Sequence, residues 1–142
     1  MNTQRLVPVA YLMLRLAAGL MFFQAGAMKI FGWFGGMPGA NGATASLTTQ
    51  VGIGGLLEVV GGILIMLGLF TRISGFILSG EMAVAYWQFH APNGAWPVLN
   101  GGVSAALYCF VFLFMAAYGG GEFSIDTLIR RRRQTAAAGA KE

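Results

Sequence analysis

Four ionisable residues stand inside long apolar stretches of this 142-residue chain, where charged side chains are costly and therefore informative. They are Arg15, Lys29, Glu58 and Glu81. A carboxyl group in an apolar setting can exchange a proton with a ligand, and a guanidinium or ammonium group can hydrogen-bond a ligand oxygen. We therefore predict Glu58 and Glu81 as candidate catalytic residues, and Arg15 and Lys29 as candidate substrate-binding residues.

The composition indicates that these residues are positioned by membrane helices. Hydrophobic residues make up 56% of the chain and charged residues only 10%, whereas a soluble domain carries about a quarter charged residues. At roughly 20 residues per bilayer crossing, the chain has room for four helices and little else. We predict an all-α integral membrane four-helix bundle, with one domain over residues 1–129, spans of about 7–31, 51–70, 73–90 and 98–118, and a basic tail over 130–142.

The basic residues outside these spans predict the orientation of the bundle. Arg5, Arg72 and Arg130–Arg133 fall on one side of a four-span protein, and segments 32–50 and 91–97 on the other side carry no charge. The positive-inside rule then places both termini of this multi-pass protein in the cytoplasm and the two longer loops outside. Because Arg130–Arg133 directly follow the last span, we expect this run to lie on anionic lipid headgroups rather than to bind nucleic acid. Asp126 is predicted to cap that short basic helix.

Histidine and cysteine are too few for several kinds of redox centre. The single Cys109 excludes an intrachain disulfide and a CxxC centre, and the single His90 excludes a bis-histidine haem within one chain. No cluster has metal-ligand spacing, so we predict no metal site. His90 and Trp96 flank the second outer loop, where aromatic and polar residues form an interfacial belt or contact a ligand.

Counting along the predicted helices indicates which charges meet. Arg15 and Glu81 each lie ~12 Å from the cytoplasmic end of their span, which predicts an Arg15–Glu81 ion pair. Glu58 lies at ~20 Å and Lys29 at ~33 Å, so their contact is the less favoured pairing. It depends on the two side chains tilting toward each other on antiparallel helices.

Helical periodicity predicts that the charges face the interior of the bundle. Each of the first three spans carries a stripe at offsets i, i+4, i+7, i+11 and i+14 that contains small residues and at least one ionisable residue. Small residues on such a stripe let helices approach closely, so these faces should pack inward. The stripes are Arg15, Gly19, Phe22, Gly26 and Lys29; Gly54, Glu58, Gly61, Ile65 and Gly68; and Ser74, Leu78, Glu81, Ala85 and Gln88.

A series of short motifs, taken in order, resembles the DoxX family of small bacterial four-helix membrane proteins, from about Leu14 to Leu128. The series departs from the family pattern at Ala25, where many members carry histidine, and at Val103, where many carry glutamate. The motifs are RLAAG (15–19), GAMK (26–29), EVVGG (58–62), GLFTR (68–72), EMAVAY (81–86), HAPNG (90–94), WPVLNGG (96–102) and GGGEFSID (119–126).

The resemblance implies a link to quinone and thiol redox chemistry. It suggests a membrane subunit that interacts with a quinone or quinol as an exchangeable ligand, with no covalently bound cofactor. A peripheral redox enzyme would supply the electrons, because the chain has no motif for flavin, haem, metal or nicotinamide. It also adds Asn100 to His90 and Trp96 as candidate substrate-binding residues. Whether the chain is itself an enzyme stays open.

Two other functions fit the same residues. Membrane-embedded carboxylates and glycine-rich faces also suit a small proton-coupled transporter that works as a homo-oligomer. A non-catalytic scaffold or assembly factor would instead need the packing glycines and not the carboxylates.

Overall fold

The computed structural model describes residues 3–39 and 41–139, and within these ranges it contains helices and no strand, which confirms the all-α prediction. α4 is a single turn. One short 3-10 turn lies between α1 and α2, and another lies between α3 and α4. The longer helices are α1 (Thr3–Phe31), α2 (Gln50–Leu67), α3 (Thr71–Ala85), α5 (Val103–Tyr118) and α6 (Ile125–Gly139). The shorter elements are the 3-10 turns Trp33–Gly35 and Ala91–Asn93, the π-helical turn Tyr86–His90, and α4 (Pro97–Asn100).

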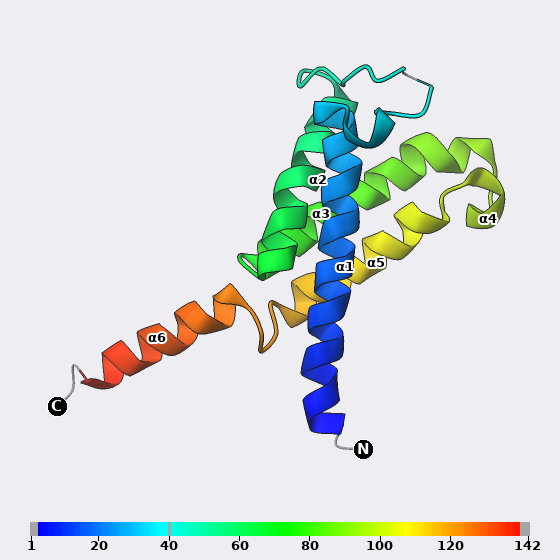
Figure 1. Ribbon diagram of the computed structural model, residues 1–142. Helices are drawn as coiled ribbons and strands as arrows, with labels where there is room; N and C mark the ends of the chain where they lie inside the picture. The colour runs from blue at the N-terminus through cyan, green and yellow to red at the C-terminus, as the bar shows by residue number, and fades with distance from the viewer. Residues whose placement is uncertain (1–2, 40, 140–142) are drawn as a thin grey trace.

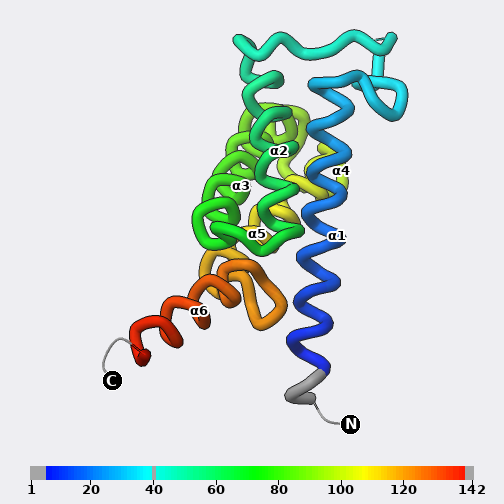
Figure 2. The backbone as a smooth tube through the Cα atoms, turned by 60° about the vertical axis from the view of Figure 1, so that its left-hand side comes forward, coloured from blue at the N-terminus to red at the C-terminus, as the bar shows by residue number. Residues whose placement is uncertain are grey.

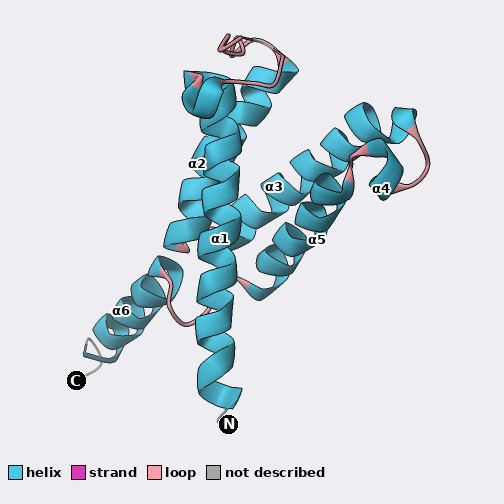
Figure 3. Cartoon of the chain, turned by 45° about the vertical axis from the view of Figure 1, so that its right-hand side comes forward, coloured by secondary structure: helices cyan, strands magenta, loops and turns pink. Residues whose placement is uncertain are grey.

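The helices form two pairs that diverge from each other. α1 packs along α2, and α3 packs along α5. The pairs meet where α2 turns into α3 and spread apart toward the end that carries the two longer loops (Figures 1 and 3). α6 extends away from both pairs at the opposite end, which is also where α1 begins (Figure 2). The arrangement is therefore an open V of two helix pairs, which leaves space between its arms.

Glycines bring the backbones of α1 and α2 into direct contact. A Cβ atom on Gly62 would lie 2.6 Å from the carbonyl oxygen of Gly19 and 2.7 Å from the nitrogen of Phe23. Two turns further along α1, Gly26 faces the backbone of Gly55 in the same way. Since backbone atoms cannot move aside as a side chain can, only glycine fits at these crossings.

Aromatic side chains connect the two pairs at the point where they meet. The ring of Phe22 on α1 packs edge-to-face against Phe112 and Tyr108 of α5, with ring centroids 4.5 and 4.9 Å apart. Ile65 of α2 and Leu78 of α3 are fully buried in the same core. Phe22, Ile65 and Leu78 all belong to the predicted stripes, so the stripes do mark the packed faces.

Two helix ends differ from the predictions. α3 ends at Ala85 and continues as a π-helical turn to His90, and the predicted fourth span is broken at Gly101, whose φ of 71° ends α4 before α5 begins. Among the described helices, Leu6–Phe31 and Gln50–Leu67 are long and apolar enough to cross a membrane, and Val103–Tyr118 is a shorter apolar helix.

Asp126 does not cap its own helix, so that prediction is wrong. α6 begins earlier than expected, and the Ser124 hydroxyl accepts the hydrogen bond from the Thr127 N–H at 3.2 Å. The Asp126 carboxylate instead accepts from the N–H groups of Phe70 and Thr71, at 2.8 and 2.9 Å, and so caps α3. The left-handed Phe70, at φ 50°, offers no side chain for that role, and the carboxylate from α6 replaces it. Residues 140–142 of the predicted tail lie outside the described part of the chain.

Candidate functional site

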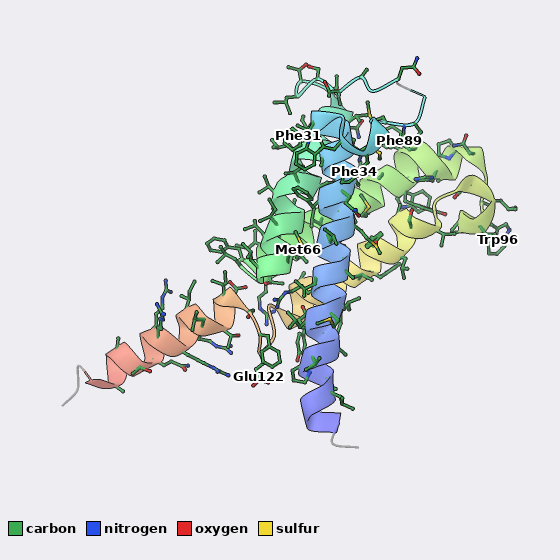
Figure 4. All side chains as sticks on the ribbon, in the orientation of Figure 1. Phe31, Phe34, Met66, Phe89, Trp96 and Glu122 are labelled. Carbon is green, nitrogen blue, oxygen red and sulfur yellow. The ribbon has the colours of Figure 1, made fainter. Side chains whose placement is uncertain are left out.

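A cavity of about 600 Å³ lies between the diverging helix pairs. Its polar lining includes Lys29, Glu58, Glu81 and His90, which come from α1, α2, α3 and the π-helical turn. Figure 4 shows Phe89 on the side of the α3 arm that faces α1. Apolar and aromatic side chains form most of the wall: Met21, Phe22, Val51, Ile53, Leu57, Met82, Val84, Phe89 and Tyr108.

Lys29 and Glu58 form an ion pair on one wall of this cavity. The Nζ atom of Lys29 lies 2.6 and 2.7 Å from the two carboxylate oxygens of Glu58. The Glu58 side chain is 5% exposed and that of Lys29 is 26% exposed. The pairing that depth counting made the less favoured one is therefore the pairing that forms. Because the ammonium group neutralises Glu58, this wall carries little net charge.

Glu81 lines the same cavity and forms no ion pair within the described part of the chain. Its Oε2 atom is buried and has no hydrogen-bond partner among residues 3–39 and 41–139. Its Oε1 atom lies 3.0 Å from the position where a Cβ atom on Gly54 would stand, so the glycine leaves room for the carboxyl group. A buried polar atom without a partner carries a free-energy cost of about 1–3 kcal/mol, which a ligand donor could remove.

Arg15 does not pair with Glu81, and that prediction is wrong. The Arg15 side chain is 2% exposed and its guanidinium binds carbonyl groups near the start of α6. Nη2 donates to the carbonyl oxygens of Phe123 and Met66, at 2.7 and 3.3 Å, and Nη1 donates to that of Gly120. These carbonyls lie in a loop and at a helix end, where no helical N–H satisfies them. Arg15 thus holds the α5–α6 connection in place and does not line the cavity.

The loop between the π-helical turn and α5 is organised by Asn100, which is buried beneath it. Its side-chain amide donates to the carbonyl of Gly94 and accepts from the N–H of Gly102, both at 2.8 Å. Its backbone carbonyl lies 3.1 Å from Nδ1 of His90. A carbonyl only accepts, so Nδ1 carries the proton of that bond and Nε2 is the acceptor of the neutral ring. Asn100 is therefore a positioning residue for His90.

Trp96 lies away from the cavity. Its side chain is 69% exposed at the tip of the α3–α5 arm (Figure 4), as expected for a residue of an interfacial belt. Ala25, one of the two departures from the family pattern, lines the cavity, whereas Val103 is 52% exposed and does not line it.

The sequence interpretation missed two residues of this region. Tyr108 lines the cavity from α5, and the only signal for it was its spacing four residues before the buried Phe112. Gln50, just before the second apolar run, also lines it, and its Nε2 donates to the Gln88 side-chain oxygen across α2 and the α3 arm. Neither residue lies inside one of the DoxX-like motifs, so motif reading alone could not find them.

Comparison with known proteins identifies the family. Residues 10–91 match the family model of DoxX. The chain belongs to the DoxX family. An uncharacterized protein of Haemophilus influenzae is 38% identical to this DoxX chain over 128 residues, which cover 88% of the chain and 94% of the relative. A second uncharacterized protein of that organism is 29% identical over 130 residues, which cover 87% and 85%. No solved structure matches the chain.

Membership in DoxX and the apolar helices together indicate a membrane protein. The matched region covers α1 from residue 10 onward and then continues through α2, α3 and the π-helical turn. It therefore contains Lys29, Glu58, Glu81 and His90, the predicted site residues that line the cavity.

Proposed function

We propose that this DoxX protein binds a quinone or quinol in the cavity between its two helix pairs, as the membrane subunit of a redox or detoxification complex. The observation that carries the proposal is the Glu81 carboxyl group, which has a buried oxygen without a partner in the described chain and faces a cavity with apolar walls. An apolar ring that carries oxygen atoms matches such a site.

The proposal includes four membrane crossings, with both termini in the cytoplasm of a bacterial inner-membrane protein. α1 and α2 cross by themselves, α3 crosses together with its π-helical turn, and α5 forms the fourth crossing. Thr71–His90 amounts to 20 residues, the length of one bilayer crossing. A membrane-impermeant maleimide should label Thr44→Cys on intact cells and Thr135→Cys only after lysis, in a Cys109→Ser background. The reverse pattern would contradict this topology.

The cavity suits a quinone ring better than a charged metabolite. Phe22, Phe89 and Tyr108 supply aromatic surface for stacking. The Lys29–Glu58 pair neutralises itself, so this wall of the cavity offers little charge with which to hold a small ion. Its volume of about 600 Å³ falls within the range of roughly 300–1,000 Å³ typical of ligand pockets.

Two groups at different places in the cavity can reach the ligand oxygens. The Glu81 carboxyl group can donate a hydrogen bond to a quinone oxygen when it is protonated and accept one from a quinol hydroxyl when it is ionised. His90 Nε2 can accept a hydrogen bond from a quinol hydroxyl. Electrons come from a partner enzyme in this proposal, because no sequence motif for a flavin, haem, metal or nicotinamide site is present.

Quinone binding to the purified protein in lipid nanodiscs tests the proposal. Saturable quenching of the fluorescence of Trp33, Trp87 and Trp96 is expected for the wild type. Glu81→Gln should weaken binding about tenfold, the effect of losing one hydrogen bond. Glu122→Gln is the matched control, because it makes the same chemical change on an exposed residue outside the cavity and should bind as the wild type does.

Two results would contradict the quinone proposal. One is the absence of saturable quenching in folded wild-type protein, and the other is an equal loss in Glu81→Gln and Glu122→Gln. Either would direct attention to the proton-coupled transporter, for which a pH-driven flux into liposomes should disappear in Glu58→Gln. The transporter has less support. Its substrate would need a path from the cavity to the opposite end of the molecule, and the groove at that end shares no lining residue with the cavity.

A further inference from the structure

A second groove, of about 720 Å³, lies at the opposite end of the molecule from the quinone cavity. It lies where the chain leaves α5, passes Gly119–Gly121 and begins α6. Three guanidinium-bearing residues line it, namely Arg72, Arg130 and Arg131, and we call it the arginine groove. In the predicted topology this end is the cytoplasmic surface of the membrane.

The arginine groove keeps a net positive charge, because its three arginines outnumber its two acidic residues, Asp126 and Glu122. Asp126 lines the groove, but its two carboxylate oxygens accept from the N–H groups of Phe70 and Thr71. Glu122 lines it as well and is exposed. Within the part of the chain that the structure describes, neither Arg130 nor Arg131 forms an ion pair. Both are exposed on the first turns of α6, so their guanidinium groups are free to bind an anion.

Arg72 is held in place at the wall of the groove. Its Nη1 atom donates to the carbonyl oxygens of Ala117 and Ala116, at 2.6 and 3.2 Å, and its Nη2 atom donates to that of Tyr118, at 3.3 Å. These bonds fix the guanidinium group at the end of α5 while its positive charge remains. A fixed cation beside two exposed arginines is an arrangement that suits a phosphate group.

Apolar side chains continue from the arginines along an exposed face of α3. Phe70 and Ile73 line the groove and are 60% and 63% exposed. Phe76 and Ile77, one turn further along α3, are 70% and 44% exposed, and their spacing of three and four residues from Ile73 places them on the same face of the helix. A ligand with an anionic head and a hydrocarbon chain matches this sequence of charge and apolar surface.

We infer that the arginine groove binds the phosphate headgroup of an anionic phospholipid, with an acyl chain lying along Phe70 and Ile73. Binding there would fix α6 against the membrane surface, because Arg130 and Arg131 belong to α6 whereas Phe70 and Arg72 flank the start of α3. The inference is independent of the quinone proposal, because the two cavities share no residue.

Two double variants with the same net charge distinguish a specific lipid site from the general attraction of a basic helix to a negatively charged membrane. Arg130→Gln/Arg131→Gln removes two charges inside the arginine groove, and Arg132→Gln/Arg133→Gln removes two charges on the same helix outside it. Native mass spectrometry of the intact protein, released from nanodiscs of mixed phosphatidylglycerol and phosphatidylcholine, counts the lipids that remain bound. We expect the wild type to retain phosphatidylglycerol at least tenfold over phosphatidylcholine. The groove variant should lose most of that preference and the control variant should keep it.

Three outcomes of the comparison between the two double variants and the wild type would overturn the inference. They are an absence of preference in the wild type, an equal loss in both double variants, and a full preference in the groove variant. Glycerol 3-phosphate distinguishes a lipid from a free phosphate ligand, because it carries the anionic group without an acyl chain. If millimolar glycerol 3-phosphate displaces the bound lipid completely, the ligand is a soluble phosphate and the lipid inference is wrong. All four arginines are exposed, and equal thermal stability of the two variants checks that both are folded.

Discussion

Gly62→Leu is expected to separate α1 from α2 and to lower the free energy of unfolding by about 3 kcal/mol. Even the first carbon of the new side chain would stand 2.6 Å from the carbonyl oxygen of Gly19. The obstacle is backbone, so the two helices must move apart along their whole contact. Gly61→Leu should cost less, because a Cβ atom there meets the flexible side chain of Leu78.

Thermal unfolding of the purified protein in detergent, followed by loss of the monodisperse peak on size exclusion, measures this effect. Gly80→Leu is the matched control, because Gly80 is an exposed glycine of α3 and a Cβ atom there meets nothing within 4 Å. Gly80→Leu should unfold close to the wild-type temperature. If Gly62→Leu and Gly80→Leu lost the same stability, close backbone packing of α1 and α2 could not be what holds that pair together.

Lys29→Met is the second substitution with a large expected effect, because it leaves the Glu58 carboxylate buried without a cation. Breaking a buried ion pair from one side costs about 3–5 kcal/mol, and the 26% exposure of Lys29 places the expected loss at the lower end of that range. Quinone binding should weaken as well, because an unpaired carboxylate draws water into the apolar cavity. The same thermal unfolding and fluorescence titrations measure both effects.

The double variant Lys29→Met/Glu58→Met is the control for the lysine prediction. It removes both charges and leaves apolar side chains of similar length, so it should recover most of the stability that Lys29→Met loses. A double variant that is less stable than Lys29→Met by the full cost of a second independent substitution would show that the two residues do not act as a pair.

The same carboxylates separate the quinone site from the scaffold alternative. A scaffold would keep its cellular function in Glu58→Gln/Glu81→Gln and lose it in Gly62→Leu. A quinone site would lose function in both variants, by losing the ligand contact in the first and the fold in the second.

Periodicity predicted the packed faces correctly, because the burial of one helix face depends on neighbours three and four residues apart. Arg15, Phe22, Glu58, Ile65 and Leu78 are all buried, as their stripes predicted. Lys29, Glu58 and Glu81 also share one cavity. This part of the site could be predicted from the sequence, because the spacing that places residues on one helix face is local and repeats along each helix.

Depth counting failed for the ion pairs because it assumed upright, parallel spans. The helix pairs diverge, so residues at equal depth on α1 and α3 are not neighbours (Figure 1). Arg15 instead meets carbonyl groups near Gly120, a contact between residues 105 positions apart. Asp126 likewise caps a helix that starts 55 residues earlier, and no local pattern indicates such partners.

Photo-labelling with an azidoquinone in nanodiscs tests most directly whether the cavity is the ligand site. After illumination and digestion, mass spectrometry locates the attached label on the chain. We predict that the label falls on residues that line the cavity, such as Leu57, Met82 and Tyr108, and that an excess of unlabelled quinone prevents it. Glu81→Gln should reduce the labelling, and Glu122→Gln should not. Label spread over exposed apolar residues such as Phe76 and Phe110, without competition by unlabelled quinone, would contradict a quinone site between the helix pairs.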